Sequence, residues 1–262
     1  MAEWIASDVP EWLVGLVFLI GLPVAMVLLQ KLVHGRLPGW RSGENNDVAG
    51  VMLSAAVVVY SVAVGLCVVT LWEKLDEARQ ATEAEATNLV ALVGGTAVFG
   101  TDVQERVRAG VIAYNRDVVD HWQERIHGDG SLAVRDDLVA LTRTVGQLDP
   151  QTDAQRAYVD DSLSRLAEAA ELRATSIRLA QEQQLPDVLW IAVLGGSVIV
   201  LGLSLTCGVR DRAMRGVLLA GVTATVGINL FMVAELNYPF YGAISIDPDS
   251  YREVIEFLQQ SR

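Results

Sequence analysis

The chain has 262 residues, of which 52% are hydrophobic and 20% charged, and its formal net charge is −12. The hydrophobic residues are gathered into long uncharged runs, which argues against a purely soluble protein. The chain is acidic overall and has no basic stripe that could neutralise phosphates, which argues against nucleic acid as a partner. The two cysteines, Cys67 and Cys207, both lie in apolar runs and indicate neither a disulfide framework nor a metal site.

Four apolar runs are each long enough to cross a hydrocarbon core of about 30 Å as a helix. Charged residues occur only at or beyond their ends, where long side chains reach the headgroups. The leader before the first run is acidic and has no Lys or Arg, so we expect this run to stay as an anchor and not to be cleaved as a signal peptide. The runs cover approximately residues 12–33, 48–72, 188–209 and 214–236.

The sequence therefore predicts an all-α integral membrane protein, with four transmembrane helices in two pairs and a helical-bundle domain inserted between the second and third spans. Pro23 predicts a kink in the first span. We expect these divisions: 1–72 for the leader and first two spans, 73–186 for the soluble domain, 187–236 for the last two spans, and 237–262 for a C-terminal segment.

The predicted domain shows apolar residues at steps of three and four, with acidic residues outnumbering basic ones, which indicates a solvated helix bundle. Capping boxes are predicted at Thr101 and Thr152. One stripe continues the second span outward without a breaker: Leu75, Ala78, Thr82, Ala86, Leu89 and Val93. Another leads towards Pro186 and the third span: Val159, Leu163, Leu166, Ala170, Ala174 and Ile177. We therefore expect the first and last helices of the domain to extend the second and third spans.

The C-terminal segment predicts one more helix. Asp249 or Ser250 can cap it, and its apolar face carries Tyr251, Val254, Ile255 and Leu258. We expect this helix to pack on the domain or on a neighbouring subunit.

Charge bias predicts the orientation in the membrane. The two short loops between paired spans carry most of the basic residues near the membrane, whereas the leader has none. Because basic residues in short loops stay in the cytoplasm, we expect the short loops inside a cell membrane and both termini and the domain outside it.

No catalytic constellation is found, so we expect no enzyme activity and no cofactor. His121 and Glu124 are an i, i+3 pair and His127 follows, but a solvent-facing pair at a helix end is favoured over a metal site. A membrane enzyme stays the least favoured of three hypotheses.

Small and polar residues inside the apolar runs point to a different function. Such residues must find a partner in the bundle or line a wet cavity. The pore-lining candidates are Ser54, Ala55, Val58, Ser61 and Gly65 in the second run and Asn229 in the fourth. The alternative is hydrogen bonding between helices or to each residue's own backbone.

Acidic residues at the outer ends of the runs predict a pore mouth that attracts cations if the chain forms a symmetric oligomer. The candidates are Glu73, Asp76, Glu235 and Asn237. The alternative is ordinary anchoring at the level of the headgroups.

Three local motifs resemble the bestrophin-like domain family of bacterial and plant membrane proteins. They are Trp72-Glu73-x-x-Asp76-Glu77-Ala78-Arg79, Leu185-Pro186-x-x-Leu189-Trp190, and Leu236-Asn237-x-Pro239-Phe240-x-Gly242 followed by Asp247-Pro248 and Tyr251-Arg252-x-Val254. The order of elements agrees along nearly the whole chain. The resemblance implies a homopentameric ion channel with a pore lined by the second spans.

The sequence departs from the family at two positions: Asn237 replaces the usual Asp, and Leu75 stands where an aromatic residue is common. Bestrophins themselves have a Phe-rich neck and a cytosolic domain, whereas the second span here has no Phe and the charge bias places the domain outside, so anion selectivity is not expected from the resemblance. Our first hypothesis is an oligomeric channel for inorganic ions in the lipid bilayer. The second is a non-conducting envelope scaffold or sensor whose domain binds a partner.

Overall fold

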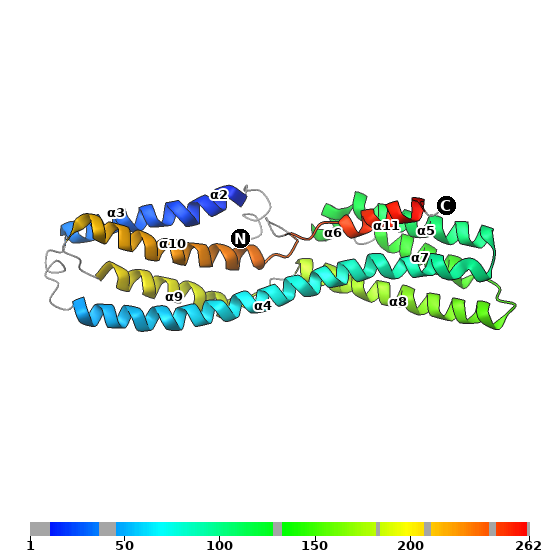
Figure 1. Ribbon diagram of the computed structural model, residues 1–262, viewed down its shortest axis with the longest axis horizontal. Helices are drawn as coiled ribbons and strands as arrows, with labels where there is room; N and C mark the ends of the chain where they lie inside the picture. Colours follow the sequence, from blue (N-terminus) through cyan, green and yellow to red (C-terminus); the bar gives the residue numbers. More distant parts are fainter. Residues whose placement is uncertain are drawn as a thin grey trace. The chain divides into compact units, whose positions relative to one another are not determined.

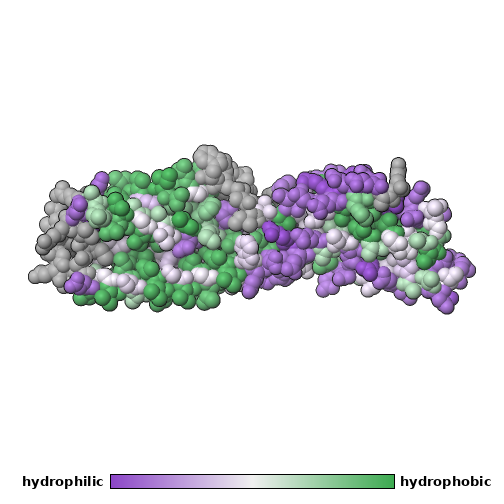
Figure 2. All heavy atoms as spheres, in the orientation of Figure 1, coloured by the Kyte–Doolittle hydropathy of each residue, from purple (hydrophilic) through white to green (hydrophobic). Residues whose placement is uncertain are grey.

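The computed structural model describes residues 11–36, 46–127, 133–181, 184–206, 211–240 and 245–260, and within these residues every regular element is a helix. The predicted Gly242 of the third motif, and Cys207, lie outside the described residues. The chain divides into two compact units. We call Met1–Glu73 with Gln183–Ile244 the apolar unit, and Lys74–Glu182 with Ser245–Arg262 the acidic unit. Figure 2 shows the visible surface of the first as mainly hydrophobic and that of the second as mainly hydrophilic.

Within the described residues, the apolar unit contains four helices of membrane length, as predicted. They cover Leu13–Val33, the first part of Asp47–Val98, Asp187–Thr206 and Ala213–Leu236. The helices are α2 (Glu11–Leu16), η1 (Val17–Gly21) and α3 (Leu22–Arg36), then the first half of α4 (Asn46–Gly95), then α9 (Asp187–Thr206) and α10 (Arg212–Leu236) (Figure 1).

The first span contains a π-helical turn just before Pro23. In η1 the N–H of Leu22 donates to the carbonyl of Val17, five residues earlier. A proline has no N–H and its ring crowds the preceding turn, so a widened turn accommodates it within the helix. The turn packs on α10, where Gly227 lies so close that a Cβ atom there would meet the carbonyl oxygen of Phe18.

The apolar part of α4 packs against α9. Tyr60 and Ser197 are hydrogen-bonded through their hydroxyls at 2.9 Å, and Ser197 also donates to the carbonyl of Val193. Gly196 makes room for the Tyr60 ring, since a Cβ atom would lie 2.7 Å from it. These contacts bury one side of α4 and leave the opposite side exposed.

The helix α4 continues without a break from the apolar into the acidic unit, as the uninterrupted stripe predicts (Figure 1). The corresponding prediction for the third span is wrong. The helix α8 (Asp153–Gln181) ends before Pro186, and α9 is a separate helix that begins at Asp187. Pro186 cannot supply the N–H that a continuous helix needs at its position.

The acidic unit is a bundle of helices in which α5 packs on α7 and α11, and α8 packs on α6 and α7. Its helices are the second half of α4, the short 3₁₀ turn η3 (Thr96–Val98), α5 (Thr101–Asp120), α6 (Trp122–His127), α7 (Ala133–Gly146), α8, and α11 (Asp249–Gln260). The predicted C-terminal helix is confirmed, and it packs on α5 of the same chain.

The two predicted capping boxes differ in outcome. At Thr152 the box forms, because its hydroxyl accepts from the N–H of Gln155 and the Gln155 side chain accepts from the N–H of Thr152, both at 3.2 Å. At Thr101 it does not form. Helix α5 starts after Gly100, whose φ of 117° is in the region that favours glycine, and no side chain caps it.

The apolar stripe predicted on α8 is wrong at three of its six residues. Leu163, Ala170 and Ala174 are exposed. The buried side carries polar residues among its apolar ones: Tyr158, Ser162, Leu166, Ala169, Arg173, Ser176, Leu179 and Ala180. A prediction based only on apolar residues could not identify this buried side, because polar residues occupy several of its positions.

Candidate pore wall and a buried polar cluster

Four of the pore-lining candidates share one side of α4. Ser54, Val58, Ser61 and Gly65 follow one another at steps of four, three and four, and all are exposed. We call these four residues the pore strip. A different side of the helix is buried and consists of Tyr60, Val64, Cys67 and Leu71.

A second exposed strip runs beside the first on α4. Val59, Val62, Leu66 and Val69 are each at least 56% exposed, and all are bulky and apolar. The exposed surface of α4 is therefore divided into a strip of mostly small residues and a strip of large apolar residues. Ala55 is exposed and continues the second strip, four residues before Val59.

The polar atoms of the pore strip are partly satisfied within the helix. The hydroxyl of Ser54 donates to the carbonyl of Gly50 at 2.9 Å, as the backbone-bonding alternative expects. Nothing within 4 Å would meet a Cβ atom at Gly65, so this position is open. Asn229 is not on α4. It lies half-buried on α10.

The mouth candidates fall into two groups. Glu73 and Asp76 are exposed and three residues apart on α4, and Asp76 accepts a hydrogen bond of 2.6 Å from the Gln80 amide. Glu235 is half-buried in the last turn of α10, whereas Asn237 just beyond it is fully buried.

Asn237 joins the end of α10 to the start of α9. Its Oδ1 accepts a hydrogen bond of 2.8 Å from the backbone N–H of Leu185. Its Nδ2 is buried and has no hydrogen-bond partner. A buried donor without a partner is costly, so the amide is a less complete fit here than a group with acceptors only.

The acidic unit contains a buried polar cluster that the sequence did not reveal. Arg125 on α6 binds Glu85 on α4 with both terminal nitrogens, at 3.2 Å from Nη1 to Oε1 and 2.6 Å from Nη2 to Oε2. The hydroxyl of Tyr114 donates to Glu85 Oε1 at 2.5 Å, and Arg125 Nη2 donates to Ser176 at 2.8 Å. The Arg125 and Glu85 side chains are 4% and 0% exposed.

Two aromatic rings cover the guanidinium of Arg125. Its Cζ lies 5.7 Å from the ring centroids of both Trp122 and Tyr251, within the range of a cation–π interaction. The two rings are 6.0 Å apart and tilted by 55°. Tyr251 comes from α11, so the C-terminal helix contributes directly to the cluster.

The charges of the cluster act on its titratable groups. Burial disfavours the charged form of Arg125 and is the largest single effect, but Glu85, Tyr251 and Tyr114 together outweigh it and raise the pKa of the guanidinium. Burial and the Glu85 carboxylate raise the pKa of Tyr114 well above 10.0. Burial also raises the pKa of Tyr251 well above 10.0, although Arg125 acts in the opposite direction.

A signal for Glu85 is nevertheless present in the sequence. The buried residues of α4 in the acidic unit recur at alternating steps of three and four, and Glu85 occupies one of these steps: Leu75, Ala78, Thr82, Glu85, Leu89 and Leu92. A carboxylate at such a position requires a buried cation. Nothing in the linear sequence indicates which arginine supplies it.

The metal candidates do not converge in the described residues, where no three His, Cys, Asp or Glu side chains are arranged to hold an ion. His121 pairs with Asp117, at 2.8 Å between Nδ1 and Oδ1. The backbone carbonyl of Asp117, and then its carboxylate, raise the pKa of His121 above its ordinary value.

In the part of the chain that the structure describes, four helices of membrane length beside a hydrophilic helix bundle are typical of a multi-span helical membrane protein. The family model of the Bestrophin-like domain matches residues 20–251, so the chain belongs to the bestrophin-like family. This is a membrane family of channel type and not one of enzymes. The resemblance carried by the three motifs is thereby confirmed.

Two solved structures have a similar fold. One is a bacterial bestrophin homologue from Klebsiella pneumoniae with an isoleucine-to-threonine substitution, at 15% identity and a TM-score of 0.70, covering 93% of this chain and 98% of that one. The other is a membrane protein with a proline-to-alanine substitution, at 16% identity and a TM-score of 0.69, covering 91% and 97%. No curated protein matches the chain.

Proposed function

We propose that the protein is a homo-oligomeric ion channel and that the pore strip of α4 lines its pore. The observation that carries this proposal is that Ser54, Ser61 and Gly65 lie together on an exposed side of α4, away from the side that packs in the bundle. An exposed helix face with small and hydroxyl-bearing residues suits a water-filled cavity better than lipid tails.

The exposed side of α9 gives the contrast. Its most exposed large residues are Val188, Ile191 and Val198, at 70% to 74%. Bulky aliphatic side chains of this kind suit contact with lipid. The second strip of α4, with Val59 and Leu66, resembles α9 in this respect and suits lipid or a neighbouring subunit.

The conducted ion is proposed to be a cation. Glu73 and Asp76 follow the pore strip on the same helix and are exposed. Repeated around a symmetry axis, these carboxylates would raise the local concentration of cations at the mouth. The resemblance to the family implies five subunits.

Purified protein in liposomes tests conduction. A potassium chloride gradient should drive a current whose reversal potential has the sign of cation selectivity. Replacing Glu73 and Asp76 with Gln and Asn should move the reversal potential towards zero, whereas Glu105→Gln on α5, also exposed, should leave it unchanged. A reversal potential that stays the same in the double variant would rule out the acidic mouth.

Cysteine scanning tests the pore strip. In a background with Cys67→Ala and Cys207→Ala, a charged thiol reagent should block current through Ser61→Cys and Gly65→Cys. Ile191→Cys on α9 is the matched control, since it is 71% exposed and is proposed to face lipid. Block at Ile191 but not at Ser61 would contradict the assignment. Absence of any current, with a sealed oligomer axis, would favour the non-conducting scaffold instead.

The orientation is also a proposal. We infer from the basic short loops that these loops face the cytoplasm of a cell membrane and that the acidic unit lies outside. A reporter active only in the cytoplasm, fused after Arg262, should be silent. An active reporter there would reverse the orientation.

A further inference from the structure

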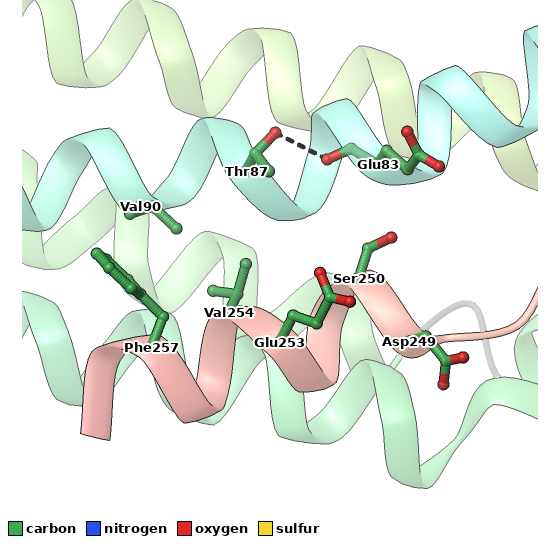
Figure 3. Close-up of a pocket in the computed structure, with 8 residues that line it drawn as sticks. All are labelled: Glu83, Thr87, Val90, Asp249, Ser250, Glu253, Val254 and Phe257. Carbon is green, nitrogen blue, oxygen red and sulfur yellow. Dashed lines mark hydrogen bonds between the residues drawn. The ribbon is translucent and has the colours of Figure 1, made fainter. Parts of the chain in front are cut away.

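The helix α11 packs more completely against α5 than against α4. It packs on α5, and Tyr251, Val254 and Leu258 are buried. Between α11 and α4 a groove of about 710 Å³ remains, lined on the α4 side by Glu83, Thr87 and Val90. Figure 3 shows Ser250, Glu253, Val254 and Phe257 of α11 on the other side of this groove.

The charges along the groove add to the incomplete packing. Glu83 on α4 and Glu253 on α11 both line it. Like charges on two facing helices oppose close approach. Phe257 is 58% exposed although it is the largest apolar side chain in the groove. The docking of α11 on α4 therefore depends on few residues.

Tyr251 is the residue through which α11 reaches the buried cluster. Its ring covers the Arg125 guanidinium, which is in turn bound to Glu85 of α4. The Tyr251 hydroxyl is buried and interacts electrostatically with Glu85 and Arg125. The Tyr251 ring, which lies 5.7 Å from the Arg125 guanidinium carbon, is the part of the side chain that keeps water from the ion pair.

The ion pair makes this docking reversible. Burying a carboxylate and a guanidinium costs desolvation energy, and that energy is recovered when water reaches the pair again. Release of α11 would expose three apolar side chains, but it would also rehydrate Glu85 and Arg125. The two effects have opposite signs, which is the condition for an element that populates a docked and a released state.

We propose that α11 is a latch: when docked, Tyr251 closes over the Glu85–Arg125 pair and fixes the Glu85 segment of α4, and when released it loosens that segment. Tyr251 is then a positioning residue for α4, the helix that carries the pore strip. The consequence for ion flow rests on the proposed function, but the latch itself does not.

Hydrogen–deuterium exchange on the full chain in lipid nanodiscs tests the latch. Tyr251→Ala should raise exchange in α11 and around Glu85 by roughly tenfold or more, with α9 and α10 unchanged. Tyr251→Phe should stay within about twofold of the original protein, because it keeps the ring. Phe257→Ala is the control on the same helix. A rise spread evenly over all helices, or one confined to α11, would overturn the proposal.

A cross-link covers the case in which Tyr251→Ala does not fold. Cysteines at Thr87 and Ser250, which line the same groove, are joined by a bis-maleimide in the background without Cys67 and Cys207. The cross-link should lower exchange around Glu85 by several-fold or more. Unchanged exchange there would contradict a latch.

Ion flux tests separately whether the protein conducts and whether the latch controls its pore. In a conducting protein, Tyr251→Ala should change flux per oligomer by about threefold or more while Phe257→Ala does not. Normal flux in a variant with a released α11 would overturn control of the pore by the latch. If the original protein does not conduct, the channel proposal fails and the exchange results alone decide whether α11 is a latch.

Discussion

Arg125 and Glu85 are 40 residues apart in the chain, yet Nη2 of the one lies 2.6 Å from Oε2 of the other in a site where both side chains are almost fully buried. The pair joins α6 to α4. Removing one partner leaves an uncompensated charge, whereas removing both leaves none, so the two kinds of variant should differ sharply.

Glu85→Ala should lower the free energy of unfolding by about 3–5 kcal/mol, because Arg125 stays buried without its carboxylate. Glu85→Leu combined with Arg125→Met should be less destabilised than the single variant. Denaturant unfolding in detergent micelles measures both. If the double variant is destabilised as much as Glu85→Ala or more, the loss in the single variant does not come from the uncompensated charge of Arg125.

Alkaline pH should destabilise the acidic unit through Tyr114 and Tyr251. Their folded-state pKa values are raised well above 10.0, so near that pH the unfolded chain releases protons that the folded chain keeps. Their contribution is complete below pH 10.0 and is lost as the pH rises towards the folded-state values.

The free energy of unfolding followed across pH 10.0 checks this effect. Tyr114→Phe should make the decline shallower by about 1.4 kcal/mol per pH unit, while leaving the slope at neutral pH unchanged. A decline as steep as in the original protein would show that Tyr114 ionises normally.

Gly227→Ala should loosen the packing of α10 on the first span. The new Cβ atom would meet the carbonyl oxygen of Phe18, a backbone atom that cannot rotate away. We expect a loss of about 1–3 kcal/mol. Gly221→Ala on the same helix is the control, since a Cβ atom there meets nothing within 4 Å. It should be neutral or stabilise by up to about 1 kcal/mol through helix propensity. Equal effects at both sites would contradict the close contact.

Asn237→Leu should cost about 1–3 kcal/mol, because the buried N–H of Leu185 loses its acceptor. Asn237→Asp keeps an acceptor and removes the unpartnered Nδ2, so it should be the better tolerated of the two. Thermal unfolding in detergent ranks the variants. A leucine variant as stable as the aspartate variant would show that the hydrogen bond to Leu185 does not hold α9 to α10.

The spans could be predicted from sequence because lipid requires long uncharged helices, and no other fold explains four such runs. The continuity of α4 was also readable from its unbroken stripe. The prediction that α8 extends the third span was wrong. The periodic pattern continues close to Pro186, whereas the helix ends at Gln181.

The buried cluster could not be predicted, because a charged residue inside a bundle is stable only beside partners that are distant in sequence. Ser176 on α8 is buried and accepts a hydrogen bond from Arg125, but nothing in the spacing of the sequence connects these two residues. The pore strip, by contrast, depends on spacing along one helix. Its exposure in the single chain agrees with the sequence pattern, and its role in conduction stays a proposal.

The π-helical turn ahead of Pro23 has a consequence for the evolution of the family. Pro23 imposes the widened turn, and Gly227 leaves room for the Phe18 carbonyl that the turn brings against α10. Neither residue is advantageous alone, since proline disrupts a regular helix and glycine weakens one. We therefore expect the two positions to change together among relatives, with a larger residue in place of Gly227 accompanied by loss of the proline.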